Sequence, residues 1–230
     1  MKIAILGTGS VGRTLAERLV KAGHEVVIGT RDVQRKLAET SNDQYGNPPF
    51  AEWQKNNSAI RLIRYDEAGA FGEVIINATK GAVSIEALEK TGKENLNGKV
   101  VIDVANPLDA SKGFPPTLIP ELSNTTSLGE KLQQSFPQAR VVKTLNTMWA
   151  GLMVNPQMIA DGDHSNFICG NDENAKQVVR TLLSDMGWHD HNVIDLGDIT
   201  SARGTEAYLP FWLRIMNARK TGAFNIRVVG

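Results

Sequence analysis

The stretch "KIAILGTGSVGRTLAERLVKAGHEVVIGTRD", residues 2–32, predicts the β-α-β unit that decides the fold. The apolar run at 2–6 is typical of a strand that is buried on both faces. Residues 10–23 carry apolar side chains on one helical face, and Gly23 is placed to end that helix. A second apolar run at 25–29 completes the unit. Because parallel strands need a crossover connection, this stretch predicts a parallel sheet.

The turn between the first strand and the helix has the G-x-G-x-x-G spacing of dinucleotide-binding folds. Gly7 allows the tight turn, Gly9 lets the backbone approach a pyrophosphate, and Gly12 lets the helix pack closely against the strand. The helix N-terminus then offers free N–H groups and a positive dipole to phosphates. A structural glycine turn is the alternative. The predicted phosphate-binding turn consists of Gly7, Thr8, Gly9, Ser10, Val11 and Gly12.

The end of the second strand indicates which dinucleotide is bound. NAD-binding folds usually carry an acidic residue there, which accepts hydrogen bonds from the ribose. This chain has Thr30 and Arg31 instead, and Arg35 and Lys36 follow one helical turn later. A guanidinium binds phosphate oxygens in a bidentate manner, and Asp32 is expected to point elsewhere. We therefore predict NADP rather than NAD, with a solvated surface arginine as the alternative.

Alternating apolar and amphipathic segments continue along the chain. They predict six strands by residue 145, the number that a doubly wound dinucleotide-binding fold needs. Residues 1–150 are therefore expected to form an NADP-binding Rossmann domain of the α/β class. Besides 2–6 and 25–29, the predicted strands are 60–64, 73–78, 99–104 and 140–145.

Residues 151–230 are expected to form a small C-terminal α/β lobe that completes the cleft. The segment 206–216 is too apolar for a solvated helix, so we expect it to form a homodimer interface with Trp212 as its anchor, with a place in the core of the chain as the alternative. The elements predicted here are a strand at 166–170, a helix at 172–187, a strand at 191–197, helical structure at 200–220 and a final strand at 223–229.

Composition excludes several function classes. The chain has 230 residues, with 25 Lys and Arg against 25 Asp and Glu, and no block of like charges that would suit nucleic acid or an anionic membrane. The single Cys169 excludes an internal disulfide and fits a reducing compartment. No apolar run approaches the ~18 residues of a membrane-spanning helix. We expect a cytoplasmic protein with a small-molecule partner.

Ligands of open α/β sheets bind at the carboxyl ends of the strands. Here those ends carry no Tyr-x-x-x-Lys pair, no Ser/His/Asp set and no histidine, so no catalytic acid or base and no metal site is predicted. Lys80 is the alternative acid. The long segments 41–58 and 108–117, with Trp149, are expected to flank the cleft. The predicted nicotinamide site consists of Ala78, Thr79, Lys80, Ala105, Asn106, Pro107 and Asn146.

Another polar cluster has two interpretations. "DITSARGTE" (198–206) brings Ser201, Arg203 and Glu206 to the start of a predicted helix. A structural cap and a contact to bound substrate or cofactor both remain open at this point.

The motifs "GTGSVG", "VVIGTRD", "NATKG", "KVVIDVANPLD", "VVKTLNTMWAGLM", "CGNDENAK" and "DLGDITSARGTE" resemble those of coenzyme F420-dependent NADP reductases and their bacterial relatives. The resemblance covers nearly the whole chain. It implies NADP as cofactor, a deazaflavin or flavin as co-substrate, and a homodimer. It also implies that Thr30, Arg31 and Arg35 hold the 2′-phosphate and that Thr79 and Asn106 lie near the nicotinamide. The archaeal members differ in carrying histidine near the position of Asn146 and in lacking the 41–58 insertion.

Three functions remain compatible with the sequence. The first is hydride transfer between NADP(H) and a deazaflavin or flavin-like ring, which mainly needs stacking and alignment. The second is NADPH-dependent reduction of a small carbonyl or imine, which needs a general acid. The third is a non-catalytic NADP-binding regulatory protein. The absence of an acid–base pair favours the first.

Overall fold

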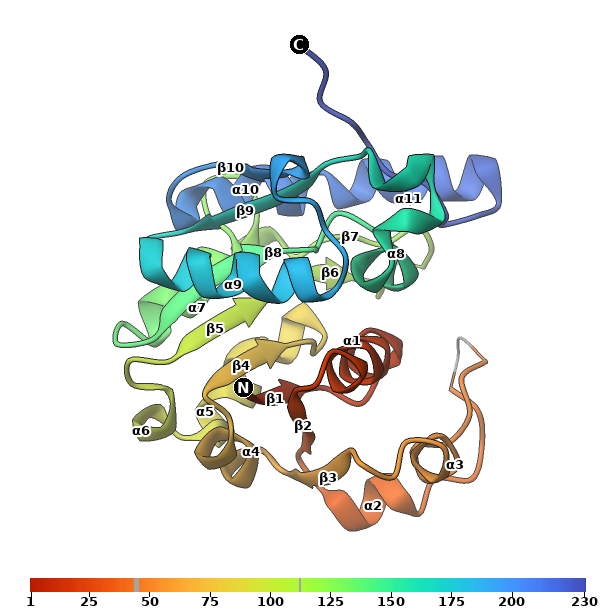
Figure 1. The fold of residues 1–230 in the computed structure, drawn as a ribbon, viewed down its shortest axis with the longest axis vertical. Coiled ribbons are helices and arrows are strands. Elements are labelled where there is room, and N and C mark those ends of the chain that lie inside the picture. Colours follow the sequence, from red (N-terminus) through yellow and green to blue (C-terminus); the bar gives the residue numbers. More distant parts are fainter. Residues whose placement is uncertain (44–45, 112) are drawn as a thin grey trace.

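The computed structural model describes residues 1–43, 46–111 and 113–230, and it confirms the predicted Rossmann-type fold. An eight-stranded sheet has the order β10-β9-β8-β5-β4-β1-β2-β3. Successive strands run outward in both directions from β1, so the carboxyl ends of β1 and β4 form the switch point of the sheet (Figure 1). Open α/β sheets bind their ligands at such a point.

All six strands predicted before residue 145 are present. β8 and β9 pair in antiparallel fashion, whereas β9 and β10 are parallel to each other. β9 and β10 therefore extend the same sheet rather than forming one of their own. The sheet strands are β1 (Lys2–Leu6), β2 (Glu25–Thr30), β3 (Arg61–Arg64), β4 (Val74–Asn77), β5 (Val100–Asp103), β8 (Arg140–Thr144), β9 (Asn166–Gly170) and β10 (Val193–Asp195).

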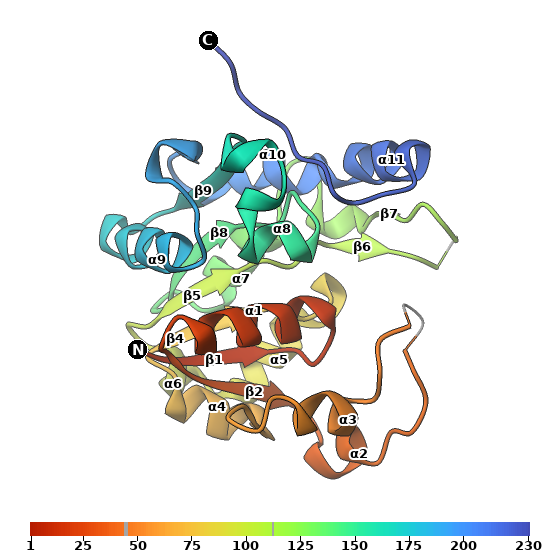
Figure 2. The same cartoon turned by 45° about the vertical axis from the view of Figure 1, so that its right-hand side comes forward.

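Helices cover both faces of the sheet (Figures 1 and 2). The sheet has one hydrophobic core on each face. In β1, Ile3 and Ile5 belong to the core that includes α1, α8 and α9, whereas Ala4 and Leu6 belong to the core that includes α4, α5 and α7. The helices are α1 (Ser10–Lys21), α2 (Val33–Leu37), α3 (Phe50–Lys55), α4 (Tyr65–Phe71), α5 (Ser84–Thr91), α6 (Lys93–Leu96), α7 (Leu128–Ser135), α8 (Ala150–Val154), α9 (Glu173–Asp185), α10 (Ala202–Ala207) and α11 (Leu209–Arg219).

The predicted strand at 223–229 is wrong. β9 already pairs with β8 on one side and with β10 on the other, so no edge of β9 is left for another strand. The C-terminal segment instead contacts the start of β9 through single hydrogen bonds. Ser165 N–H donates to the Ile226 carbonyl at 2.9 Å, and Val228 N–H donates to the Ser165 hydroxyl at 3.0 Å.

The two long segments are partly ordered by secondary structure that the sequence did not indicate. Within 41–58, α3 places Phe50 in the core, and Trp53 donates through Nε1 to Glu17 at 2.5 Å. Between 108 and 118, β6 (Leu108–Asp109) and β7 (Thr117–Leu118) form a short antiparallel hairpin. Residues 44, 45 and 112 of these segments lie outside the described residues.

The apolar helix α11 packs within its own chain. Trp212 is only 6% exposed and stacks on Phe224 with ring centroids 5.2 Å apart, while Phe211 is 61% exposed. The side chain predicted to anchor an interface is thus buried inside the protomer. In the described part of the chain, no helix has the length and apolar character that a membrane crossing requires.

Candidate cofactor site

The glycine turn is shaped by close backbone approach at two positions and by open space at the third. A Cβ at Gly7, where φ is +124°, would lie 2.4 Å from the Ala78 carbonyl oxygen. A Cβ at Gly12 would lie 2.2 Å from the Gly7 carbonyl oxygen. Glycine is therefore required at both positions for packing. A Cβ at Gly9 would meet nothing within 4 Å, so the turn leaves open space above this residue.

The start of α1 faces this open space without a side-chain cap. Gly9 is the N-cap residue and has no side chain to accept hydrogen bonds from the first turn. The helix ladder starts with Arg13 N–H, which donates to the Gly9 carbonyl at 3.0 Å. A helix N-terminus of this kind suits an anion, because its N–H groups and its dipole both favour negative charge.

Charged residues at the end of β2 divide into paired and unpaired groups. The Asp32 carboxylate accepts Arg35 N–H at 2.9 Å and so caps α2. Lys36 pairs with Glu39 at 2.6 Å. Arg31 and Arg35 are exposed, and among the described residues neither guanidinium forms an ion pair. Asp32 thus caps α2, and among the described residues two guanidinium groups near the buried Thr30 have no ion-pair partner.

Arg13 was not singled out by the sequence reasoning, yet it connects the glycine turn to the 41–58 segment. Its Nε donates to the Thr8 carbonyl at 2.9 Å, and one terminal nitrogen donates to the Pro48 carbonyl at 2.7 Å. The guanidinium also lies over the rings of Phe50 and Trp53, at 5.3 and 5.6 Å from the centroids. Burial lowers the pKa of Arg13, with nearby acidic residues opposing the shift. No local pattern marks this residue, because its partners depend on where a distant loop folds.

The predicted nicotinamide residues lie along neighbouring strand ends. A Cβ at Gly81 would lie 2.3 Å from the Asn106 carbonyl oxygen. Nδ2 of Asn106 donates to the backbone carbonyl of Asn146 at 2.8 Å, and Nδ2 of Asn146 donates to Oδ1 of Asn106 at 2.9 Å. The β4, β5 and β8 ends therefore form one continuous edge. Ala78, Thr79 and Asn106 are half-buried, Ala105, Pro107 and Asn146 are buried, and Lys80 is exposed.

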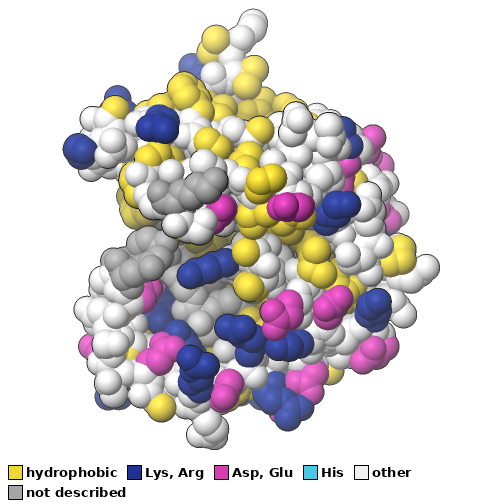
Figure 3. Space-filling view, turned by 180° about the vertical axis from the view of Figure 1, so that it is seen from behind, with side chains coloured by type: hydrophobic (Ala, Val, Ile, Leu, Met, Phe, Trp, Pro, Cys, Tyr) yellow, Lys and Arg dark blue, Asp and Glu magenta, His cyan; other side chains and the backbone are white. Residues whose placement is uncertain are grey.

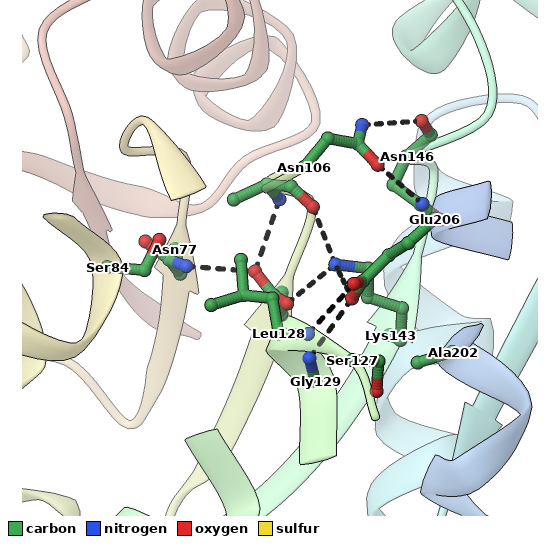
Figure 4. A network of polar contacts seen from close by, with 12 residues as sticks. Asn77, Ser84, Asn106, Ser127, Leu128, Gly129, Lys143, Asn146, Ala202 and Glu206 are labelled. Carbon is green, nitrogen blue, oxygen red and sulfur yellow. Dashed lines mark hydrogen bonds and ion pairs between the residues drawn. The ribbon is translucent and has the colours of Figure 1, made fainter. Parts of the chain in front are cut away.

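Thr79 is held by a chain of polar contacts beneath this edge, and Figure 4 shows the part of the chain that runs from Asn77. Its hydroxyl donates to Oδ1 of Asn77 at 2.7 Å and lies 2.9 Å from the Ser84 hydroxyl. Nδ2 of Asn77 in turn donates to Oδ1 of Asp103 at 2.8 Å. Each group in the chain fixes the orientation of the next one.

The centre of this network is a buried charge cluster that the sequence did not reveal (Figure 4). The Lys143 ammonium lies 2.8 Å from Oδ2 of Asp103 and 2.8 Å from Oε1 of Glu206, and it donates to the Ala105 carbonyl at 2.5 Å. Asp103 also accepts Ala105 N–H at 3.1 Å. The cluster therefore holds both backbone polar groups of Ala105, next to Asn106.

Burial and charge act in opposite directions in this cluster. Burial would lower the pKa of Lys143, but the carboxylates of Asp103 and Glu206 outweigh it and raise that pKa. Burial raises the pKa of Glu206, and the Lys143 ammonium opposes this shift. The side chains of Lys143 and Asp103 are fully buried, so neither can reach a bound substrate.

The structure gives Ser201, Arg203 and Glu206 structural partners. Glu206 accepts Leu128 N–H and Gly129 N–H at 2.8 and 3.0 Å, at the start of α7. Arg203 Nε donates to Glu130 at 2.8 Å, and the Ser201 hydroxyl donates to the Leu196 carbonyl at 2.7 Å. Of the two interpretations left open, capping and pairing account for all three contacts.

Cys169 is buried, and burial raises the pKa of its thiol to about 12, which keeps the thiol protonated.

Trp149, beyond the end of β8, is 43% exposed. On the face opposite to that of Figure 1 the molecule is hollowed, and Lys and Arg side chains gather around the hollow (Figure 3). The strand ends thus offer amides, a hydroxyl, one exposed ammonium and an exposed indole.

Fold and turn together define a Rossmann-type dinucleotide-binding protein, and comparison with known proteins specifies the family. The family model of NADP oxidoreductase, coenzyme F420-dependent, matches residues 2–107. A solved structure of a candidate F420-dependent NADP reductase from Arthrobacter sp. FB24 is 52% identical, covers 100% of both chains and superposes with a TM-score of 0.93. The chain belongs to this family of NADP-dependent oxidoreductases.

Two curated relatives extend the comparison. The F420-dependent NADP reductase of Methanothermobacter marburgensis is 32% identical over 114 residues, which are 49% of this chain and 48% of that protein. Metalloreductase STEAP3 of Rattus norvegicus is 32% identical over 219 residues, 92% of this chain. The chain spans only 38% of the length of that metalloreductase.

Proposed function

We propose that the chain binds NADP(H) along the edge from the glycine turn to Asn146 and transfers a hydride between the nicotinamide and a deazaflavin or flavin-like ring. The observation that carries the cofactor choice is the end of β2. There Asp32 is engaged as a helix cap, while Arg31 and Arg35 are unpaired among the described residues. Free guanidinium groups beside Thr30 suit a 2′-phosphate better than a bare ribose.

The backbone at the turn fits the rest of the cofactor. Open space above Gly9 and the uncapped start of α1 suit a pyrophosphate. Further along, Thr79 and the Asn106–Asn146 pair would hold the carboxamide end, since their side chains are fixed by the contacts described above. Bound NADPH would supply the hydride from C4 of its nicotinamide.

The choice of acceptor rests on what the strand ends lack. Among the described residues that directly follow β4, β5 and β8, Lys80 is the one exposed ionisable side chain, and the charges of Asp103 and Lys143 are buried against each other. Reduction of a carbonyl requires proton delivery to the oxygen, whereas hydride exchange between two flat rings requires chiefly alignment. The exposed Trp149 and Phe114 would supply an apolar flank for a planar ring.

The test is a panel of acceptors with NADPH, followed by the loss of absorbance of the reduced nicotinamide. A deazaflavin or a flavin should oxidise NADPH faster than any simple aldehyde, ketone or imine in the panel. With NADPH deuterated at the transferring face, deuterium should appear at the acceptor carbon of the deazaflavin, which does not exchange with water. Faster turnover of small carbonyls or imines would replace this proposal with the reductase alternative.

Lys80→Met gives an independent check of the mechanism. If no proton transfer depends on this ammonium, the variant should keep the rate within roughly tenfold of the original. Lys90→Met, which removes an exposed lysine from α5, is the matched control. If Lys80→Met abolishes turnover while Lys90→Met does not, Lys80 is the general acid and the small-substrate function is favoured. NADPH binding without turnover of any acceptor would indicate the regulatory alternative.

A further inference from the structure

A line of hydrogen bonds runs from the buried charge of Asp103 to the edge of the candidate cofactor site. Asn77 and Asp103 are fully buried, whereas Thr79, just beyond the end of β4, is half-buried. Nδ2 of Asn77 donates to Oδ1 of Asp103, and the Thr79 hydroxyl donates to Oδ1 of Asn77. The line therefore links a charge in the interior to a residue of the edge that is partly open to solvent.

Every partner of the Asp103 carboxylate among the described residues is a hydrogen-bond donor. Oδ1 accepts from Nδ2 of Asn77 at 2.8 Å and from Ala105 N–H at 3.1 Å. Oδ2 accepts from the Lys143 ammonium at 2.8 Å. A carboxylate accepts at both oxygens, whereas an amide of the same size would have to turn its NH2 group toward one of these donors.

The carboxylate fixes the direction of each bond that follows it. Because Asp103 accepts, the NH2 group of Asn77 faces it, and the amide oxygen of Asn77 faces Thr79. That oxygen also only accepts, so the single hydroxyl proton of Thr79 is committed to it. The Ser84 hydroxyl, 2.9 Å from the Thr79 oxygen, takes at most one of its two lone pairs. Toward a ligand, Thr79 can therefore act only as an acceptor.

The buried cluster holds this arrangement from below. The three N–H bonds of the Lys143 ammonium are taken up by Asp103, Glu206 and the Ala105 carbonyl. Glu206 is fixed in turn by two backbone N–H groups at the start of α7. The direction of the line is thus set by packed interior groups before any ligand is bound.

We propose that Asp103 is a positioning residue for the cofactor, which presents the Thr79 oxygen as the acceptor for an N–H of the nicotinamide carboxamide. This inference rests on the proposed function, in which the nicotinamide lies at this edge. A carboxamide nitrogen carries two N–H donors, so it suits a hydroxyl that can only accept. Asp103 does not touch the cofactor, because its side chain has no solvent exposure.

Three ligands separate the contact to the carboxamide from the rest of cofactor binding. They are NADP⁺, its 3-acetylpyridine analogue, in which a methyl group replaces the amide NH2, and 2′-phospho-ADP-ribose, which lacks the ring. Titration calorimetry measures their affinities without turnover. The original protein should bind NADP⁺ about 5- to 10-fold more tightly than the analogue, the usual value of one hydrogen bond. Thr79→Val should remove that preference and leave the affinity for 2′-phospho-ADP-ribose unchanged.

Asp103→Asn tests the direction of the line. The Lys143 ammonium is a charged donor, so the amide oxygen of the variant should turn to it and the NH2 group should turn to Asn77. The amide of Asn77 would then turn over and donate to Thr79, which would free the Thr79 proton for the ligand. The acetylpyridine analogue accepts but does not donate at this position, so the preference for NADP⁺ should disappear.

A double exchange should restore the original direction. In the variant that combines Asn77→Asp with Asp103→Asn, the new carboxylate can accept from the Thr79 hydroxyl and from the variant amide. The number of charges in the cluster stays the same. The preference for NADP⁺ should therefore return, although the bond to Ala105 N–H is lost.

Lys176→Met is the matched control for disturbing a buried ion cluster. Lys176, on α9, is 2% exposed and lies 2.6 and 2.9 Å from the carboxylates of Glu173 and Asp195, outside the candidate cofactor site. This variant should lower the melting temperature, as Asp103→Asn should, but keep the preference for NADP⁺. Loss of the preference in Lys176→Met would mean that the effect of Asp103→Asn reflects stability alone, which would overturn the proposal.

The outcomes distinguish this inference from the proposed function. If the original protein binds neither NADP⁺ nor 2′-phospho-ADP-ribose, the proposed function is wrong. If it binds NADP⁺ no more tightly than the analogue, or if Asp103→Asn keeps the preference, only the role of Asp103 is wrong. Equal weakening of NADP⁺ and the analogue by Thr79→Val would assign Thr79 to the ribose instead. Should Asp103→Asn fail to fold, Asn77→Leu cuts the line, frees the Thr79 proton and should abolish the preference in the same way.

Discussion

Lys143 and Asp103 stand directly opposite each other in the ladder between β8 and β5, and their side chains form an ion pair of 2.8 Å with no solvent exposure. Glu206 approaches the same ammonium at 2.8 Å from α10. The cluster thus joins two strands and a helix beneath Ala105 and Asn106. A buried lysine that offsets two carboxylates cannot be lost without leaving their charges uncompensated.

Lys143→Met should lower the free energy of unfolding by about 3–5 kcal/mol, because two buried carboxylates would lose their partner. Urea denaturation measures this change. Lys90→Met, which breaks an ion pair whose side chains are 51% and 47% exposed, should cost less than about 1 kcal/mol. Equal effects of the two substitutions would show that the buried cluster does not stabilise the fold.

Arg31→Ala should weaken NADP(H) binding roughly 10- to 100-fold and leave NAD(H) binding nearly unchanged. A charge-assisted phosphate contact contributes about 1.5–3 kcal/mol, and only NADP carries the 2′-phosphate. Titration calorimetry with both cofactors measures the difference. Arg214→Ala, which removes an exposed arginine of α11, is the control for net charge. Equal affinity of the original protein for NADP and NAD would exclude the proposed role of Arg31.

Gly9→Val and Gly12→Val should fail in different ways. At Gly9 the backbone has φ of −77° and an added Cβ meets open space, so the variant should fold but lose NADPH binding. At Gly12 an added Cβ would lie 2.2 Å from the Gly7 carbonyl oxygen, so that variant should lose stability. Thermal melts and fluorescence titration with NADPH separate the two results. Normal NADPH binding by Gly9→Val would mean that the phosphates lie elsewhere.

The Glu130–Arg203 pair predicts a loss of stability in acid. The hydrogen bond from Arg203 holds the pKa of Glu130 below its usual value of 4.5. The folded protein therefore binds this proton less readily than the unfolded chain does, and the pair stabilises the fold fully only above that usual value. The urea midpoints of the original protein and of Arg203→Gln should differ most near about pH 7 and converge as pH falls below about 4. A difference that does not change with pH would contradict this origin.

The homodimer stays a prediction. Because Trp212 is buried in its own chain, a homodimer would have to use other apolar groups, and Phe211, 61% exposed on α11, is the natural candidate. Light scattering at micromolar concentration should give the mass of a dimer, and Phe211→Glu should reduce it to that of a monomer. Arg214→Ala should leave the mass unchanged. A monomeric original protein would show that α11 belongs to the core alone.

The sequence predicted the parallel sheet well because its signals are local. A strand buried on both faces is a short apolar run, and the glycine spacing of the turn is set by contacts within one β-α-β unit. The sequence also predicted that the Asp32 side chain points elsewhere, and the structure shows it capping α2 through a contact that lies within a few residues. The strand at 223–229 was wrong because strand pairing depends on free sheet edges, which a local pattern does not contain.

What the sequence by itself determined is the glycine turn, the six strands up to residue 145, and the threonine and arginine that end β2. The tertiary structure alone decided the reversed direction of β9 and β10, the tie between Arg13 and Pro48, and the buried cluster beneath Asn106. Asp103 and Lys143 are 40 residues apart in the chain and read as ordinary members of two apolar runs. Their pairing follows from the strand order and register, which long-range packing sets.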